Sequence, residues 1–201
     1  MIAIKPDTGT RRMLDQLLSR RSTSQLETPA PEGPELELIL DAGLRAPDHG
    51  HLRPWRFVLI RGEARARLGA LLAGATLARD PSAAPALVER YRGWPLRMPL
   101  LIGVGTRLRP GHPVPEVEQL LSAGAAAMNM LNAIHLLGYG GIWVTGPNAY
   151  DDRVNAALGF TAPDRLVGFL AVGTPKAPPT GAPRPKRAAH VVEWMGAASN
   201  S

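Results

Sequence analysis

The chain has 201 residues, 45% of them hydrophobic, and a formal net charge of +6. This length and hydrophobic content are typical of one globular domain, and they exclude a chain that is largely disordered. The absence of cysteine excludes disulfides, thiolate nucleophiles and thiolate metal sites, so electron transfer would need an organic cofactor or a site of histidines and carboxylates.

Arginine supplies most of the positive charge, because only three of the 23 basic residues are lysines. The arginines occur as singles and pairs without interleaved aromatic residues, which does not favour nucleic-acid binding. No apolar run approaches the roughly 20 residues that a membrane span needs. Residues 1–7 show no charged region followed by an apolar region, so we expect no export signal and a cytoplasmic protein.

Hydrophobic periodicity and turn residues predict an α+β domain with a central sheet flanked by helices. The predicted helices cover about residues 13–20, 34–46, 63–77, 84–92, 116–137 and 151–158. The predicted strands cover residues 56–60, 100–105, 141–145 and 166–172. Gly138 is expected to end the longest helix.

The carboxyl end of the chain reads as an arm. Five prolines between residues 175 and 185 predict an extended segment without secondary structure. Residues 190–195 resume an apolar, strand-like pattern and must dock somewhere, for which a partner subunit is a plausible place. We therefore expect one domain over residues 1–174 and an arm over residues 175–201.

Three segments predict a binding site. The loop Arg45–Trp55, rich in Pro, Gly, His and Arg, suits a large, planar, anionic ligand better than it suits packing. Arg20–Ser22 either complements the dipole of the preceding helix or captures a phosphate. Trp143 is by default a core aromatic residue, although the two glycines before it suggest close backbone approach to something flat.

Other site types fit the sequence poorly. Gly103-Val104-Gly105 follows a predicted strand, but the third glycine and the helix start of a Rossmann dinucleotide site are missing. Phosphate-binding loops of the Walker type and serine nucleophile elbows do not occur. Asp48, His49 and His51 fix no ligand geometry, so we expect no metal site.

Together these segments resemble the FMN-dependent nitroreductase family, most closely its compact bacterial branch of NAD(P)H nitroreductases. The resemblance runs from about residue 13 to residue 175. It rests on Ser19–Ser22, Ala42–His49, Pro54-Trp55, Ser122–Gly124, Gly138–Trp143 and Val167–Pro175.

The resemblance implies a mostly antiparallel sheet and a homodimer with C-terminal arm exchange, in which both subunits shape each FMN site. Arg20, Arg21 and Ser22 would hold the phosphate and ribityl end of FMN. Arg45 and His49 would approach the flavin from the partner subunit. The backbone that borders the ring would be Trp143, Val144 and Thr145. The segment matched to NAD(P)H consists of Ala133, Ile134, His135, Leu136, Leu137 and Gly138.

The implied function is hydride transfer from NAD(P)H through FMN to a small oxidised acceptor, such as a nitroaromatic or a quinone, in a ping-pong cycle without a catalytic side chain. Two alternatives keep the flavin: a dehydrogenase of an unknown metabolite, and a binding module without turnover. A basic nucleic-acid binder is a more distant alternative. The chain has His51 and Arg53 where the broader family often carries Asn and Gln.

Overall fold

The structure is a computed structural model, and it describes residues 7–181 and 183–196. The expectation about an export signal therefore lies mostly outside the described residues, as do Ala182 and positions 197–201 of the arm. The α-helices are α1 (Thr8–Ser19), α2 (Gly33–Gly43), α3 (Ala64–Arg79), α4 (Pro85–Gly93), α5 (Glu116–Leu136) and α6 (Asp152–Ala157). The strands are β1 (Leu26–Glu27), β2 (Trp55–Ile60), β3 (Leu100–Thr106), β4 (Gly140–Val144) and β5 (Arg165–Pro175).

One five-stranded sheet forms the middle layer, and every strand pair in it is antiparallel. The order is β1-β5-β3-β2, with β4 also paired to β5. β5 is long enough to pair with three strands because it continues to Pro175, beyond the predicted end at residue 172. The expectation of an α+β fold with an antiparallel sheet is confirmed.

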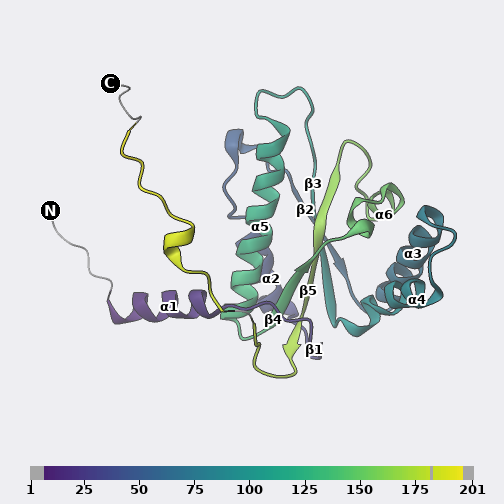
Figure 1. The fold of residues 1–201 in the computed structure, drawn as a ribbon, viewed down its shortest axis with the longest axis horizontal. Helices are drawn as coiled ribbons and strands as arrows, with labels where there is room; N and C mark the ends of the chain where they lie inside the picture. Colours follow the sequence, from purple (N-terminus) through teal and green to yellow (C-terminus); the bar gives the residue numbers. More distant parts are fainter. Residues whose placement is uncertain (1–6, 182, 197–201) are drawn as a thin grey trace.

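Helices cover both faces of the sheet (Figure 1). On one face, α2 and α5 pack on Leu100, Ile102 and Leu170. On the other face, α3 and α6 pack on Leu101 and Phe169, among others. Alternate residues of β3 therefore feed two separate cores, which explains why this strand is a continuous apolar run.

α2 crosses α5 at close range. A Cβ atom at Gly43 would lie 2.9 Å from the Cγ atom of Met130, so only glycine fits this crossing without a shift. The Asn129 side chain donates from Nδ2 to the carbonyl of Ala42 at 3.2 Å. The end of α2, and with it the start of the loop that follows, is thus fixed against the middle of α5.

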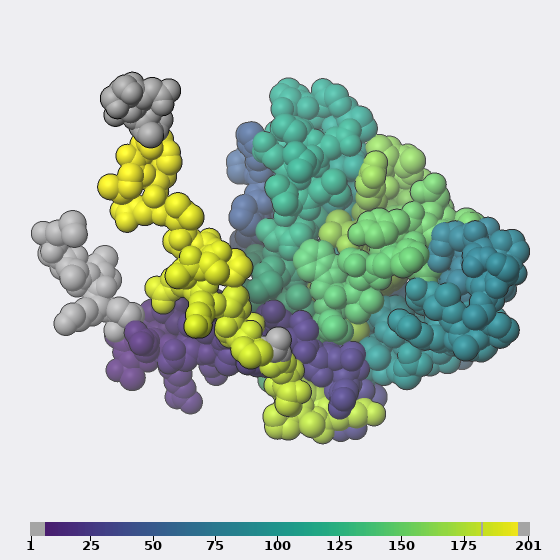
Figure 2. Space-filling view, viewed as in Figure 1, coloured from purple at the N-terminus to yellow at the C-terminus, as the bar shows by residue number. Residues whose placement is uncertain are grey.

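α1 and the arm stand apart from this body (Figures 1 and 2). None of the residues of α1 is buried. The strand expected at residues 190–195 is not formed in the single chain, where Val192 is 92% and Trp194 84% exposed. Arg187–Ala189 form a short 3-10 helix instead of extended chain. No helix in the described part of the chain is both long and apolar enough to cross a bilayer.

Candidate functional site

The first group of predicted site residues lies at the end of α1, next to β4 and the end of α5. The Thr23 amide donates to the carbonyl of Gly141 at 3.2 Å, which fixes this segment beside β4. His135 Nε2 lies 3.0 Å from Ser19 Oγ and 2.9 Å from the carbonyl oxygen of Gln16. These contacts place Arg20, Arg21 and Ser22 at the carboxyl end of α5, and we call this group the amino-terminal corner.

The amino-terminal corner is rich in guanidinium groups. Arg20 Nη1 donates to Ser22 Oγ at 3.5 Å. Arg184 of the arm donates to the carbonyls of Leu18 and Arg20, and a Cβ atom at Gly181 would lie 2.7 Å from Nη1 of Arg21. Within the described residues neither Arg20 nor Arg184 forms an ion pair with a carboxylate. Guanidinium groups without carboxylate partners have the donor chemistry that suits an anion.

The second group, the loop Arg45–Trp55, is anchored near the other end of α5. Trp55 Nε1 donates to Ser122 Oγ at 2.9 Å, and this hydroxyl donates to the carbonyl of Pro47 at 2.6 Å. His49 Nδ1 lies 2.6 Å from Oε2 of Glu118. Glu118 could not be selected from the sequence, because acidic residues such as Glu116 and Glu118 are ordinary in the first turn of a helix.

The same loop has a strained backbone. His51 and Arg53 have φ of 53° and 49°, and Gly50 between His49 and His51 has φ of 71°. Left-handed backbone at a residue other than glycine costs about 1–3 kcal/mol, and such strain clusters at functional sites. A hydrogen bond of 2.8 Å from the Arg53 amide to Asp48 Oδ2 helps to hold this left-handed backbone conformation.

The third group lies along β4. Trp143 packs against the adjacent β5, where a Cβ atom at Gly168 would lie 2.3 Å from Trp143 Nε1. This Nε1 is buried without a hydrogen-bond partner among the described residues. Val144 is half-buried and Thr145 is exposed, so the backbone at the end of β4 is accessible.

The segment matched to the nicotinamide nucleotide covers the last turn of α5. Ile134 is 1% exposed and belongs to the core, with Ala133 and Leu137 packed against the same cluster. Leu136 and Gly138 are exposed. Any ligand contact from this turn would therefore come from Leu136, Gly138 or His135.

The structure does not bring all the predicted residues together in one chain. The amino-terminal corner contacts α5 at His135, whereas the loop contacts α5 at Glu118 and Ser122. At 1.5 Å of rise per residue, Glu118 and His135 are about 25 Å apart along the helix. His49 therefore lies far from Arg20, Arg21 and Ser22 of the same chain, whereas Arg45 begins the loop beside the middle of α5, where Asn129 contacts Ala42.

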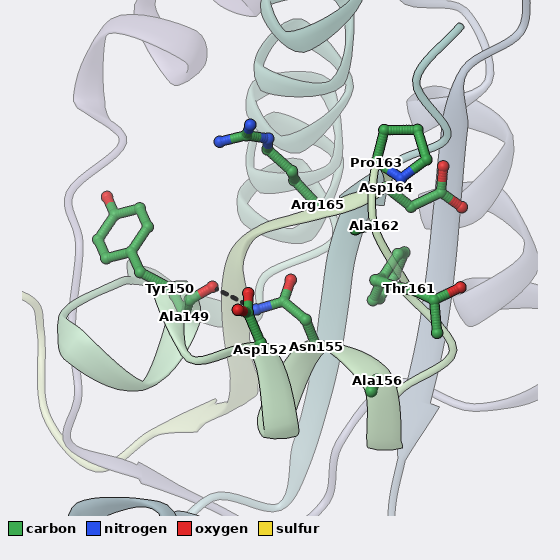
Figure 3. Close-up of a pocket in the computed structure, with 11 residues that line it drawn as sticks. Ala149, Tyr150, Asp152, Asn155, Ala156, Thr161, Ala162, Pro163, Asp164 and Arg165 are labelled. Carbon is green, nitrogen blue, oxygen red and sulfur yellow. Dashed lines mark hydrogen bonds between the residues drawn. The ribbon is translucent and has the colours of Figure 1, made fainter. Parts of the chain in front are cut away.

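A separate pocket of about 400 Å³ lies between α6 and the start of β5 (Figure 3). Its polar groups serve the fold: Asn155 donates from Nδ2 to the carbonyls of Ala149 and Asp151 and accepts at Oδ1 from the Leu166 amide. None of the predicted site residues lines it. The candidate site residues lie instead at the two ends of α5 and at the end of β4.

Comparison with known proteins identifies the family. The model of the nitroreductase family matches residues 17–174. The chain belongs to the nitroreductase family. This nitroreductase-family chain is 43% identical over 164 residues to "Putative NAD(P)H nitroreductase YdjA" of Escherichia coli, with 81% of the chain and 88% of the relative covered.

Solved nitroreductases share the fold. A nitroreductase-like family protein from Bacillus cereus is 22% identical, with a TM-score of 0.78 over 98% of this chain and 100% of that one. A second structure, a "putative nitroreductase in complex with fmn" from Desulfovibrio desulfuricans, is 25% identical, with a TM-score of 0.70 over 96% of this chain and 100% of that one.

Proposed function

We propose that this nitroreductase-family protein is a homodimeric FMN-dependent oxidoreductase that passes hydride from NAD(P)H to a small oxidised acceptor. The observation that carries the proposal is the division of the site residues between the two ends of α5. A twofold axis that crosses α5 near its middle runs two copies antiparallel. The loop of one copy then approaches the amino-terminal corner of the other.

The exposed face of α5 supports this packing. Val117, Leu121 and Met128 are exposed apolar residues, and with Gly124 they form a stripe at spacings of four, three and four. Such spacing marks the seam between two packed helices. The exposed apolar residues Met13, Leu14, Leu17 and Leu18 of α1 and Val191, Val192, Trp194 and Met195 of the arm would be covered by the same partner.

The residues fit FMN, as their donor chemistry indicates. The guanidinium groups of Arg20 and Arg21 and the Ser22 hydroxyl suit a phosphate, and the accessible backbone at Val144 and Thr145 suits a flat ring. Trp143 Nε1 is a buried donor without a partner beside this backbone. This N–H lies against Gly168 of the adjacent β5, so the fit to FMN rests on the guanidinium, hydroxyl and backbone groups.

When bound, FMN supplies the two-electron chemistry that links oxidation of a nicotinamide to reduction of a second substrate in a ping-pong cycle. This chain's own residues bind and orient. The corner neutralises the phosphate charge, and Arg45 and His49 of the other copy would close the site. Exposed Leu136 and Gly138 are open to the nucleotide. The acceptor is a small planar oxidant such as a nitroaromatic or quinone.

Titration with FMN tests the cofactor assignment. Arg20→Ala and Arg21→Ala should each weaken FMN binding about 10- to 100-fold, since a hydrogen bond to a charged group contributes about 1.5–3 kcal/mol. Arg67→Ala, an exposed residue of α3 with only a surface ion pair to Glu63, is the matched control. A protein that binds no FMN, or variants that bind it like the wild type, would contradict the assignment.

Mixing variants tests whether the site is shared. Arg20→Ala damages the corner of its own chain, and Arg45→Ala damages the loop contributed to the partner. A dimer of one chain of each kind contains one site with both parts intact. Co-expressed variants should therefore regain the FMN binding and the flavin bleaching by NADH or NADPH that are weakened in each variant alone. Failure to complement, or a monomeric wild type in sedimentation, would overturn the shared site.

A further inference from the structure

Three arginines line a cleft on the loop side of the molecule. Arg45, Arg53 and Arg56 surround a space of about 510 Å³ together with Asp41, Leu44 and Trp55. The volume is within the range of about 300–1,000 Å³ that small-molecule sites occupy. The charged lining carries three positive charges and one negative charge.

Two of the three guanidinium groups of this cleft, those of Arg45 and Arg53, are not engaged in holding the fold. Within the part of the chain that the structure describes, the side chains of Arg45 and Arg53 have neither a hydrogen-bond nor an ion-pair partner. Asp41 forms no ion pair with them either. Neighbouring like charges repel, so their gathering without acidic partners indicates an anionic ligand.

The backbone beside the cleft is strained. Arg53 is held in the left-handed region, with φ of 49°. Its amide is fixed by Asp48 Oδ2 at 2.8 Å, and its carbonyl accepts from Arg56 Nη1 at 3.4 Å. Arg56 Nη1 also donates to the Trp55 carbonyl at 2.6 Å. The hydrogen bonds of Arg56 thus help to hold the loop backbone in the conformation that carries Arg53.

We propose that this cleft binds the 2′-phosphate of the nicotinamide donor and makes the protein prefer NADPH to NADH. This inference rests on the proposed function. In the antiparallel dimer, the loop side of one copy approaches the carboxyl end of the other copy's α5, where Leu136 and Gly138 are exposed. The cleft then lies beside the bound NADPH and contacts only its 2′-phosphate. Arginine forks match phosphate oxygens in two hydrogen bonds, and NADH offers no such group.

Binding of 2′,5′-ADP and of 5′-AMP, measured by calorimetry at low salt, tests the site without any redox step. The first ligand should bind at least tenfold more tightly, since one charge-assisted hydrogen bond contributes about 1.5–3 kcal/mol. Arg53→Gln should remove about tenfold of that preference, and Arg53→Lys should retain part of it. Arg67→Gln, on α3, should leave it unchanged.

The kinetic counterpart is the ratio of kcat/KM for NADPH and NADH, which should fall about tenfold in Arg53→Gln. Equal binding of 2′,5′-ADP and 5′-AMP, or a preference that Arg53→Gln leaves intact, would overturn the cleft assignment even in an active enzyme. Tight, Arg53-dependent binding of 2′,5′-ADP by a protein that neither binds FMN nor oxidises NADPH would support the cleft and refute the proposed function.

Discussion

Replacing Asp151 should destabilise the fold strongly, because its carboxylate is buried in a network that joins α3 to the start of α6. Asp151 has a side chain 3% exposed, and its Oδ2 accepts from Arg79 Nη1 at 2.5 Å. Its Oδ1 accepts from the Arg153 amide at 3.0 Å, which makes it the N-cap of α6. Arg79 is 29% exposed and also donates to Asn148 Oδ1 at 2.7 Å.

The expected loss can be separated into two parts. Removing an N-cap acceptor costs about 0.5–2 kcal/mol. Breaking a fully buried ion pair costs about 3–5 kcal/mol, which we reduce to about 2 kcal/mol because Arg79 retains contact with solvent. Asp151→Ala should therefore lose about 3 kcal/mol of unfolding free energy. Asp151→Asn keeps a capping oxygen and should lose about 2 kcal/mol.

Urea unfolding at a fixed protein concentration, with and without saturating FMN, measures these losses. In a chain of this size, the loss in Asp151→Ala corresponds to a fall in Tm of about 6–12 °C. Asp152→Ala, an exposed neighbour in the first turn of α6, should change the unfolding free energy by less than about 0.5 kcal/mol. A loss below about 1 kcal/mol in Asp151→Ala would refute the reasoning.

The network also predicts a pH dependence. Burial raises the pKa of Asp151, but the hydrogen bond from Arg79, the amide of Arg153 and the Arg153 charge outweigh it, so the pKa is lowered overall. The stabilisation from Asp151 is then fully present above its unfolded pKa of about 3.9 and is lost as the pH falls through the lower folded pKa. The stability difference between wild type and Asp151→Asn should shrink as the pH falls below about 4.

Two further substitutions, with a third as a control, probe the surroundings of the site. Ser122→Ala leaves the indole N–H of Trp55 and the carbonyl of Pro47 without their buried partner. We therefore expect a loss of about 1–3 kcal/mol of unfolding free energy, measured in urea, and weaker FMN binding. Unchanged values of both would show that the hydroxyl does not anchor the loop. Gly168→Ala places a Cβ atom 2.3 Å from Trp143 Nε1 at a backbone φ of 152°. It should lose more than about 2 kcal/mol and shift tryptophan fluorescence. Gly74→Ala, with open space around it in α3, should instead gain up to about 1 kcal/mol; equal effects of the two glycine substitutions would contradict the packing argument.

Periodic, strongly apolar segments could be predicted from the sequence to within a few residues. α5 ends at Leu136 where residue 137 was expected, and β3 ends at Thr106 where residue 105 was expected. α5 is long and β3 is wholly buried, so the order of apolar and polar side chains in each one indicates its type and its length. β1 was missed because two residues carry no alternation, and it pairs only with the end of β5.

The site could be predicted as residue types but not as an arrangement. Arginine, glycine and tryptophan segments predict a ligand chemistry, while the placement of Arg20 and His49 at opposite ends of α5 depends on tertiary packing. The left-handed Arg53 follows from hydrogen bonds within the loop that composition does not encode. Residues 190–196 form no strand in one chain, since a strand needs a neighbour to pair with.

The exposure of α1 on all sides affects how the protein behaves on dilution. A helix of twelve residues without a buried side chain is marginally stable in water, and its last turn leads into Arg20. Whatever covers Leu17 and Leu18 would therefore also hold the proposed phosphate site in its conformation. Amide hydrogens of α1 should exchange quickly in a separated subunit and slowly in an assembled one, and affinity for the phosphate should rise with protein concentration.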